Sequence, residues 1–287
     1  MILLDLNQVM ISNLMMQIGA NENNVEEDLV RHMVLNSIRM YKQKFTKDYG
    51  ELVICCDDKN YWRKDIFPYY KAHRKADREK SPLDWNKVFE CLNKIREELK
   101  QTFPYKVIQV ERAEADDVIA VITHRFGTWI NNETTEKILI LSGDKDFSQL
   151  QKYANVDQFS PVTKKWITIV DPKRFLKEHI MKGDRGDGIP NFLSNDSTII
   201  SGERQKPLSS KKLDQWVDLE PEEFCNTEML RNYKRNEQLV DLEFIPSEIV
   251  HKINSCFDKY TTPERNGLLN YFIKHRLKLL TEHIGEF

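Results

Sequence analysis

Short apolar runs that alternate with segments of helical periodicity are the feature that most constrains the fold of this chain. The runs span residues 2–6, 52–56, 105–110, 137–141 and 156–159. Their length is typical of buried strands. Residues 26–45 and 85–99 carry apolar side chains at three- and four-residue steps, which predicts amphipathic helices, the second with Asp84 as N-cap. This alternation predicts an α/β fold with a mostly parallel central sheet flanked by helices.

The pattern changes after about residue 170, where short helices with polar connections replace the strands. We therefore expect an α/β domain at residues 1–180 and a smaller α-helical region at residues 181–287. Residues 191–210 are rich in Ser and Asn and lack a sustained period, which predicts a loop. Asp5 interrupts the apolar N-terminus too early for a signal peptide or a membrane span, so we expect a cytoplasmic protein.

Acidic residues follow the predicted strands. Carboxyl ends of parallel strands lie along one edge of a sheet, where ligands bind, so acids from distant segments are expected to meet there. Further acids open the helix after the third strand, in E-A-D-D, and occupy the turn G-D-R-G-D-G-I-P. The candidates are Asp5, Asp57, Glu114, Asp116, Asp117, Asp144, Asp146, Asp184 and Asp187.

So many carboxylates cannot converge without positive charge, because each unpaired buried carboxylate would take up a proton. The five cysteines lack CxxC spacing and the seven histidines never recur at ligand-like spacing, which predicts that oxygen atoms alone hold any metal. Oxygen ligands favour Mg²⁺, with Mn²⁺ as an alternative, and two ions about 3.5–4 Å apart are typical of phosphodiester hydrolysis. A lone acid at a strand end is more often a turn or cap residue. A metal site is favoured because acids occur at five such places together: three strand ends, the helix start E-A-D-D and the turn G-D-R-G-D-G-I-P.

Several segments resemble the flap endonuclease (5′-nuclease) family, which includes the 5′-nuclease domain of bacterial DNA polymerase I. They are L-L-D-L-N-Q, C-D-D-K-N-Y-W-R-K-D-I-F-P-Y-Y-K, E-A-D-D-V-I-A, L-S-G-D-K-D-F-S-Q-L, S-P-V-T-K-K-W and K-G-D-R-G-D-G-I-P. They stand in family order over nearly the whole chain, and the resemblance is strongest to the ribonuclease H branch of T-even-type bacteriophages. It implies a PIN-like 5′-nuclease core.

The resemblance implies a metal-dependent 5′→3′ exonuclease and flap endonuclease that acts on RNA–DNA hybrids and duplex DNA and removes primers during lagging-strand replication. It implies two Mg²⁺ ions. The first group of ligands would be Asp5, Asp57, Glu114, Asp116 and Asp144, and the second Asp146, Asp184 and Asp187, with Asp117 in support. A monomer is expected, with a single-stranded DNA-binding protein and a sliding clamp as partners and the host cytoplasm as the location if a phage encodes the chain.

The chain also contains a basic run, which the resemblance implies to be the path of the substrate strand. Residues 59–80 hold eight Lys and Arg against three acids. In the family this segment, about residues 59–83 here, forms an arch that passes a single strand. The resemblance implies that Lys71 and Arg74 contact the scissile phosphate and that Tyr69 or Tyr70 stacks on a base. The other substrate-binding candidates are Arg63, Lys64 and Lys75.

Gly188 departs from the family pattern, which has Asn at this position of the turn. A second glycine hairpin normally follows closely and grips the duplex. Its counterpart here is either Gly202-Glu203-Arg204 or residues 206–212, after a longer polar insertion.

Three other functions compete with this one. A PIN-type ribonuclease shares the strand-end acids but is smaller and has fewer of them. A phosphatase of the haloacid dehalogenase type would need D-x-D after the first strand, where this chain has Asp5-Leu6-Asn7. A catalytically silent DNA-structure-binding module would gain nothing from a full set of carboxylates facing phosphates.

Overall fold

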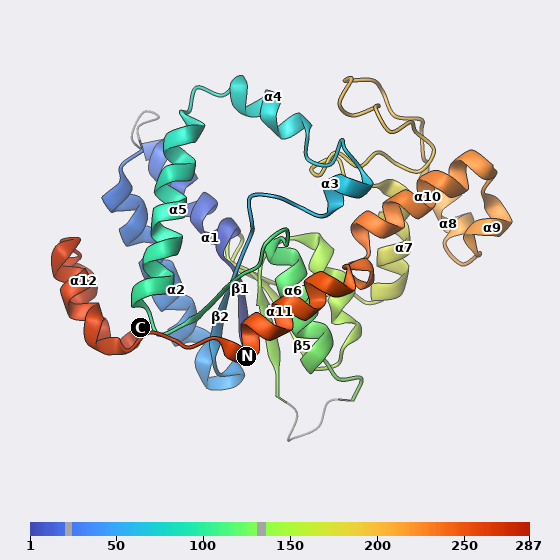
Figure 1. Cartoon of the computed structure of the whole chain (residues 1–287). Coiled ribbons are helices and arrows are strands. Elements are labelled where there is room, and N and C mark those ends of the chain that lie inside the picture. Colours follow the sequence, from blue (N-terminus) through green and yellow to red (C-terminus); the bar gives the residue numbers. More distant parts are fainter. Residues whose placement is uncertain (21–24, 131–135) are drawn as a thin grey trace.

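A six-stranded sheet forms the centre of the computed structural model, which describes residues 1–20, 25–130 and 136–287 (Figure 1). The strand order is β3-β2-β1-β4-β5-β6, with β1 to β5 parallel and β6 antiparallel to β5. The strands are β1 (Ile2–Asp5), β2 (Leu52–Cys56), β3 (Lys106–Gln109), β4 (Ile138–Leu141), β5 (Val156–Ser160) and β6 (Lys165–Ile167). The predicted α/β fold with a mostly parallel sheet is confirmed.

Strand β6 was not predicted from the sequence. It has three residues, and two of them are exposed, so it carries neither an apolar run nor an alternating pattern. The strand exists because β5 offers it a free edge, with Phe159 paired to Trp166.

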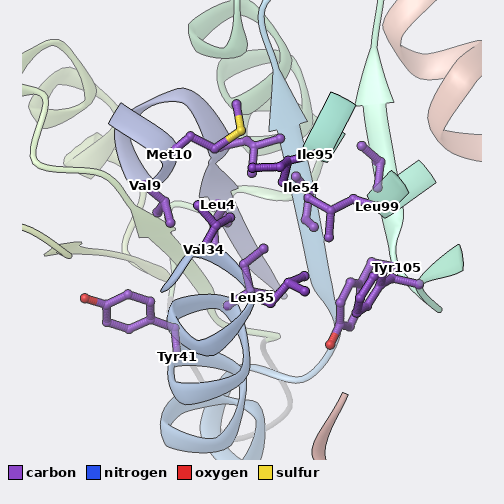
Figure 2. Packing of buried hydrophobic residues seen from close by; sticks show 14 of the residues in the cluster. Leu4, Val9, Met10, Val34, Leu35, Tyr41, Ile54, Ile95, Leu99 and Tyr105 are labelled. Atoms are coloured by element: carbon purple, nitrogen blue, oxygen red, sulfur yellow. The ribbon is translucent and has the colours of Figure 1, made fainter. Parts of the chain in front are cut away.

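Helices cover both faces of the sheet. Alternate strand residues point to opposite faces, so Ile2 and Leu4 enter one hydrophobic core and Leu3 enters the other. Figure 2 shows the first core, where Val34 and Leu35 of a helix pack near Leu4 and Ile54 of the sheet. The main elements of the first face are α1 (Leu6–Ala20), α2 (Glu27–Tyr49), α5 (Trp85–Thr102) and α12 (Leu268–Lys274), and those of the second are α6 (Ala115–Phe126), η1 (Lys145–Lys152) and α11 (Ser247–Lys259).

Local sequence explains the two long helices that were predicted. Helix α2 buries Val30, Val34, Ile38, Tyr41 and Phe45, which lie at three- and four-residue steps. Helix α5 begins at the predicted cap, where the Asp84 side chain accepts hydrogen bonds from the backbone N–H groups of residues 86 and 87. No helix among the described residues is both long and apolar enough to cross a membrane.

A third hydrophobic cluster lies beyond the sheet and joins the helical segments to the basic run. Phe192 lies in it, and Phe67 and Tyr70 of the basic run pack into it. The elements there are α3 (Arg63–Ile66), α7 (Pro172–Lys182), α8 (Ser210–Trp216), α9 (Pro221–Phe224) and α10 (Thr227–Val240). Helix α4 (His73–Glu79) has no buried residue, and Figure 1 shows it at the top of the molecule between α3 and α5. The basic run is therefore anchored at its base and exposed along α4.

The chain returns to the sheet after α10. Helix α11 packs against α6 and β3, and Phe287 lies in the first core beside Phe103 and Phe272. The remaining short elements are η2 (Leu242–Phe244), η3 (Arg265–Gly267), α13 (Lys278–Thr281) and η4 (Ile284–Glu286). Residues 191–209 contain neither helix nor strand, which confirms the loop predicted at residues 191–210 except for Ser210, the first residue of α8.

Candidate metal centre

Three neighbouring strands bring the first acids to one edge of the sheet. Asp5 ends β1 and pairs in register with Cys55 of β2, two residues before Asp57. Asp144 follows β4, the other neighbour of β1. The Asp5 carboxylate accepts hydrogen bonds from the hydroxyl of Ser142 at 3.0 Å and the backbone N–H of Gln8 at 3.1 Å. Asp5 is thereby held in one orientation at the centre of this edge.

The N-terminus of α6 adds Glu114 and Asp116 to the same edge, and it also carries Asp117. The backbone N–H of Ala115 donates to Asp57 at 2.6 Å, which ties the start of α6 to the end of β2. The Asp117 carboxylate accepts from the backbone N–H of Glu114 at 2.8 Å, as in a capping box. The motif E-A-D-D therefore both starts the helix and places acids at the sheet edge.

Glu114 is surrounded by donors. The guanidinium of Arg63 and the hydroxyl of Tyr70 donate to one of its carboxylate oxygens, each at 2.9 Å, and the ammonium of Lys71 donates to the other. Burial acts to raise the pKa of Glu114, but the charges of Lys71 and Arg63 outweigh it and hold this pKa below its ordinary value. Protein cations thus neutralise Glu114 in this structure.

Asp117 faces the protein interior. Its carboxylate is fully buried, accepts from the indole N–H of Trp62 at 3.0 Å and lies 2.8 Å from the guanidinium of Arg63. Asp117 therefore fixes Arg63 and Trp62 rather than facing the sheet edge.

Two predicted substrate contacts are wrong in this structure. Arg63 is 3% exposed and its guanidinium is committed to Glu114, Asp117 and a backbone carbonyl, so no phosphate can reach it. Tyr70 is 2% exposed, and its hydroxyl bonds Glu114 and Asp187, so its ring offers no open face to a base. Sequence could not reveal this, because both residues are buried by the third hydrophobic cluster and by α6, which are distant in the chain.

The remaining residues of the basic run lie at the surface or beside the acids. Tyr69 is 38% exposed, and Lys64 and Lys75 are exposed as well. Lys71 lies against Glu114, and the guanidinium of Arg74 donates to Asp187 at 2.7 Å. The structure thus brings Lys71 and Arg74 to the acids and leaves the other three open.

The second group of acids lies around the turn that follows α7. Asp184 accepts hydrogen bonds from the backbone N–H groups of Gly186 at 2.7 Å and Asp187 at 3.2 Å, which closes the turn. The ammonium of Lys145 lies 2.9 Å from the Asp184 carboxylate. Burial alone would raise the pKa of Asp184, but His179 and Lys145 bring this pKa well below its ordinary value.

Gly188 allows this turn to approach the basic run. Its φ of +77° lies in the left-handed region, and a Cβ atom there would lie 3.0 Å from the backbone oxygen of Tyr69. The backbone N–H of Lys71 donates to the carbonyl of Asp187 at 2.7 Å across the same contact. An Asn at this position, as in the family pattern, would meet the base of the basic run, so the departure at Gly188 has a steric reason.

His179 belongs to this group and was missed by sequence reasoning. Its imidazole lies 3.4 Å from the Asp146 carboxylate and 3.3 Å from that of Asp184. The three residues offer ligand atoms that all lie within 4.8 Å of one another. The prediction that oxygen atoms alone hold any metal did not include this imidazole, which the structure places among the acids. Sequence spacing could not predict this contact, because it depends on a turn. Gly183 turns the chain with a φ of +66° and directs Asp184 back toward the end of α7.

The electrostatics of the centre require positive charge. Burial, followed by repulsion from Asp57, raises the pKa of Asp5 to about 7. Burial, followed by repulsion from Asp144, raises the pKa of Asp146 to about 7 and that of Asp116 well above its ordinary value. Divalent cations fit this centre, because they would neutralise carboxylates that otherwise hold protons.

We expect the stability of the metal-free protein to fall as pH rises from about 4 to about 7. Asp5 and Asp146 have pKa values of about 7 when folded and near 3.8 when unfolded, so over this interval the folded state binds more protons. The lowered pKa values of Glu114 and Asp184 act only at lower pH.

Thermal unfolding in EDTA should therefore show a Tm several degrees lower at about pH 7.5 than at about pH 5. A divalent cation should raise the Tm mainly at the higher pH, and Asp5→Asn should flatten the dependence. A larger effect of the cation at the lower pH would contradict this assignment.

Comparison with known proteins gives two matching family models. One, described as the 5′–3′ exonuclease N-terminal resolvase-like domain, matches residues 3–180, and the other, described as T4 RNase H, C terminal, matches residues 173–287. Ribonuclease H of Enterobacteria phage T4 is 35% identical over 99% of this chain and 95% of that protein. Flap endonuclease Xni of Shewanella sp. (strain MR-4) is 32% identical over 47% of this chain and 49% of its own length.

Solved structures share the fold. The T5 D15 protein crystallised with metal ions superposes with a TM-score of 0.60 at 14% identity, over 90% of this chain and 98% of that one. Zinc-bound T5 5′-exonuclease gives a TM-score of 0.59 at 16% identity, over the same shares. These structures therefore share the fold of this chain, but their sequence identity is too low to assign roles to individual residues.

Proposed function

This chain belongs to the 5′–3′ exonuclease family, a family of metal-dependent nucleases, and on that premise we propose that it cleaves phosphodiester bonds at 5′ ends and flaps in duplex DNA and RNA–DNA hybrids. One observation carries the proposal. Asp5, Asp57, Asp116 and Asp144 converge on one sheet edge from three strand ends and the start of α6. The acids alone would repel one another, so their convergence supports a centre built for cations.

Two Mg²⁺ ions, with Mn²⁺ as an alternative, would be held by two groups of side chains. Asp5, Asp57, Asp116 and Asp144 would hold the first, with Glu114 beside them, and Asp146, Asp184 and Asp187 would hold the second. Bound divalent ions supply an activated water and neutralise charge on the phosphate and the leaving oxygen. Asp117 contributes by fixing Arg63, which in turn orients Glu114.

The basic run would guide the strand to this centre. Lys71 contacts Glu114 and Asp187, and Arg74 contacts Asp187, so a phosphate that approaches the centre meets their charges. Lys64 and Lys75 are exposed for contacts to the backbone, and Tyr69 is exposed for stacking on a base. Residues 59–83 would act as the arch of the α/β domain at residues 1–180, and the helical segments at residues 181–287 would bind the duplex.

A cleavage assay tests the proposal. The protein is incubated with a labelled 5′-flap DNA and with an RNA–DNA hybrid, in Mg²⁺ and in EDTA. We expect cleavage in Mg²⁺ only, with 5′-phosphorylated products and a monomeric enzyme. Binding without cleavage under both conditions would favour a silent DNA-binding module, and cleavage confined to single-stranded RNA would favour a PIN-type ribonuclease.

We expect Lys71→Ala and Arg74→Ala to slow the chemical step by about 10-fold to 1,000-fold, because each removes a positive charge beside the reacting phosphate. Single-turnover rates at saturating enzyme measure this step. Lys75→Ala is the matched control, since Lys75 is exposed and, unlike Lys71 and Arg74, forms no ion pair with these acids in the described part of the chain, and it should affect binding more than the rate. An unchanged single-turnover rate in both variants would remove Lys71 and Arg74 from the site.

A further inference from the structure

His179 is buried and aimed into the second group of acids. It is 5% exposed and lies near the end of α7. Its Nε2 atom lies 3.3 Å from an Asp184 oxygen, yet it makes no hydrogen bond, and the Asp146 oxygen that faces the other side of the ring also lacks one. The imidazole thus lies between two carboxylates, with Nδ1 at 3.4 Å from Asp146 and Nε2 at 3.3 Å from Asp184. Buried polar atoms without hydrogen bonds are costly, and a cation bound by this group would give them a partner.

The geometry of this cluster suits a metal ion. The separation of 3.3 Å between Nε2 of His179 and Asp184 is close to the edge of a tetrahedral site with bonds of about 2.0 Å. The ring of Phe175 packs edge-on against the imidazole with centroids 5.8 Å apart, which fixes the orientation of His179. Two carboxylates and a neutral imidazole would together balance the charge of a divalent cation.

Lys145 would compete with such a cation for the carboxylate of Asp184. Its ammonium lies 2.9 Å from Asp184, but the side chain is 56% exposed, so it can turn out into solvent at little cost. The ammonium of Lys145 that neutralises Asp184 can therefore be replaced by a metal ion, whereas the buried imidazole stays in place.

We propose that His179 is a nitrogen ligand of a divalent cation shared with Asp146 and Asp184, and that this nitrogen makes the second metal position select Mn²⁺ and similar transition ions over Mg²⁺. The inference rests on the proposed function, because that function assigns Asp146 and Asp184 to a metal, and it makes Mn²⁺, the alternative ion named there, the preferred ion at this second position. Mg²⁺ binds oxygen ligands and is held poorly by imidazole, whereas Mn²⁺, Co²⁺ and Zn²⁺ accept imidazole nitrogen. The first group would remain an oxygen site.

Electron spin echo spectroscopy of Mn²⁺ bound to the metal-stripped full chain tests the ligand directly. We expect the wild-type protein to show modulation from a directly bound ¹⁴N nucleus. The variant His179→Gln should lose this modulation and bind Mn²⁺ about 10-fold to 100-fold more weakly, while its affinity for Mg²⁺, measured by competition, changes less than about threefold. The matched control is His124→Gln. His124, like His179, lies beside a carboxylate, and it also contacts a tyrosine hydroxyl, but it lies outside the centre.

Two results would overturn the proposal. One is the absence of a nitrogen signal from Mn²⁺ in the wild-type protein, which does not depend on the folding of any variant. The other is an equal loss of Mn²⁺ and Mg²⁺ affinity in His179→Gln, which would make His179 a positioning residue. Cleavage of the flap substrate in Mg²⁺ without a nitrogen signal would refute this inference alone, whereas a nitrogen signal without cleavage in any metal would refute the nuclease proposal alone.

Discussion

We expect Asp116→Asn to lower the single-turnover rate of flap cleavage by about 1,000-fold or more while substrate affinity changes less than about threefold. Burial, followed by repulsion from Asp144, Glu114 and Asp5, raises the pKa of Asp116 well above its ordinary value. An amide in its place keeps the shape but removes a negative charge that would hold the catalytic ions. The basic run is untouched, so DNA binding in EDTA should persist.

The same variant has a second signature. Because Asp116 is repelled by its neighbours when no metal is present, Asp116→Asn should make the metal-free protein more stable, as judged by urea unfolding in EDTA. Asp58→Asn is the matched control, since Asp58 lies next to Asp57 but accepts hydrogen bonds from the backbone N–H groups of Asn60 and Arg112. Cleavage by Asp116→Asn at near the wild-type rate would exclude Asp116 from the metal centre.

We expect Arg63→Met to lower the free energy of unfolding by about 3–5 kcal/mol, the largest stability effect of any single change that we predict. Arg63 is buried and its guanidinium lies within 3 Å of both Glu114 and Asp117. Removing one partner of a buried ion pair leaves the other charges without compensation, which costs about that much. Urea unfolding at pH 7 in EDTA measures the loss.

Lys64→Met provides the control for Arg63→Met. Lys64 is the next residue in the chain and is exposed, so its replacement should change the free energy of unfolding by less than about 0.5 kcal/mol. Adding Asp117→Asn to Arg63→Met should restore part of the loss, because one uncompensated carboxylate is removed. A loss below about 1 kcal/mol in Arg63→Met would show that Arg63 does not carry this network.

Arg63 also shows where sequence reasoning failed. Its charge and its position within the basic run predicted contact with a substrate, but charge along the chain does not say which side of a short helix faces the protein. Its guanidinium lies over the ring of the adjacent Trp62 and pairs with Glu114 and Asp117 at the start of α6, a remote segment of the chain, and these contacts bury it. His179 was missed for a related reason. Its partner Asp184 lies beyond a turn, and its partner Asp146 follows a different strand.

The acids that end β1, β2 and β4 were predictable because a parallel sheet aligns the carboxyl ends of its strands, and that rule needs only the pattern of apolar runs. The pattern of apolar runs therefore predicted the five parallel strands, the helices α2, α5 and α6, and the edge at which the carboxylates meet. The tertiary structure decided which charged groups of that edge stay accessible and which are buried as counter-charges, and it added His179. Such choices depend on distances between elements remote in the chain, and local periodicity carries no information about them.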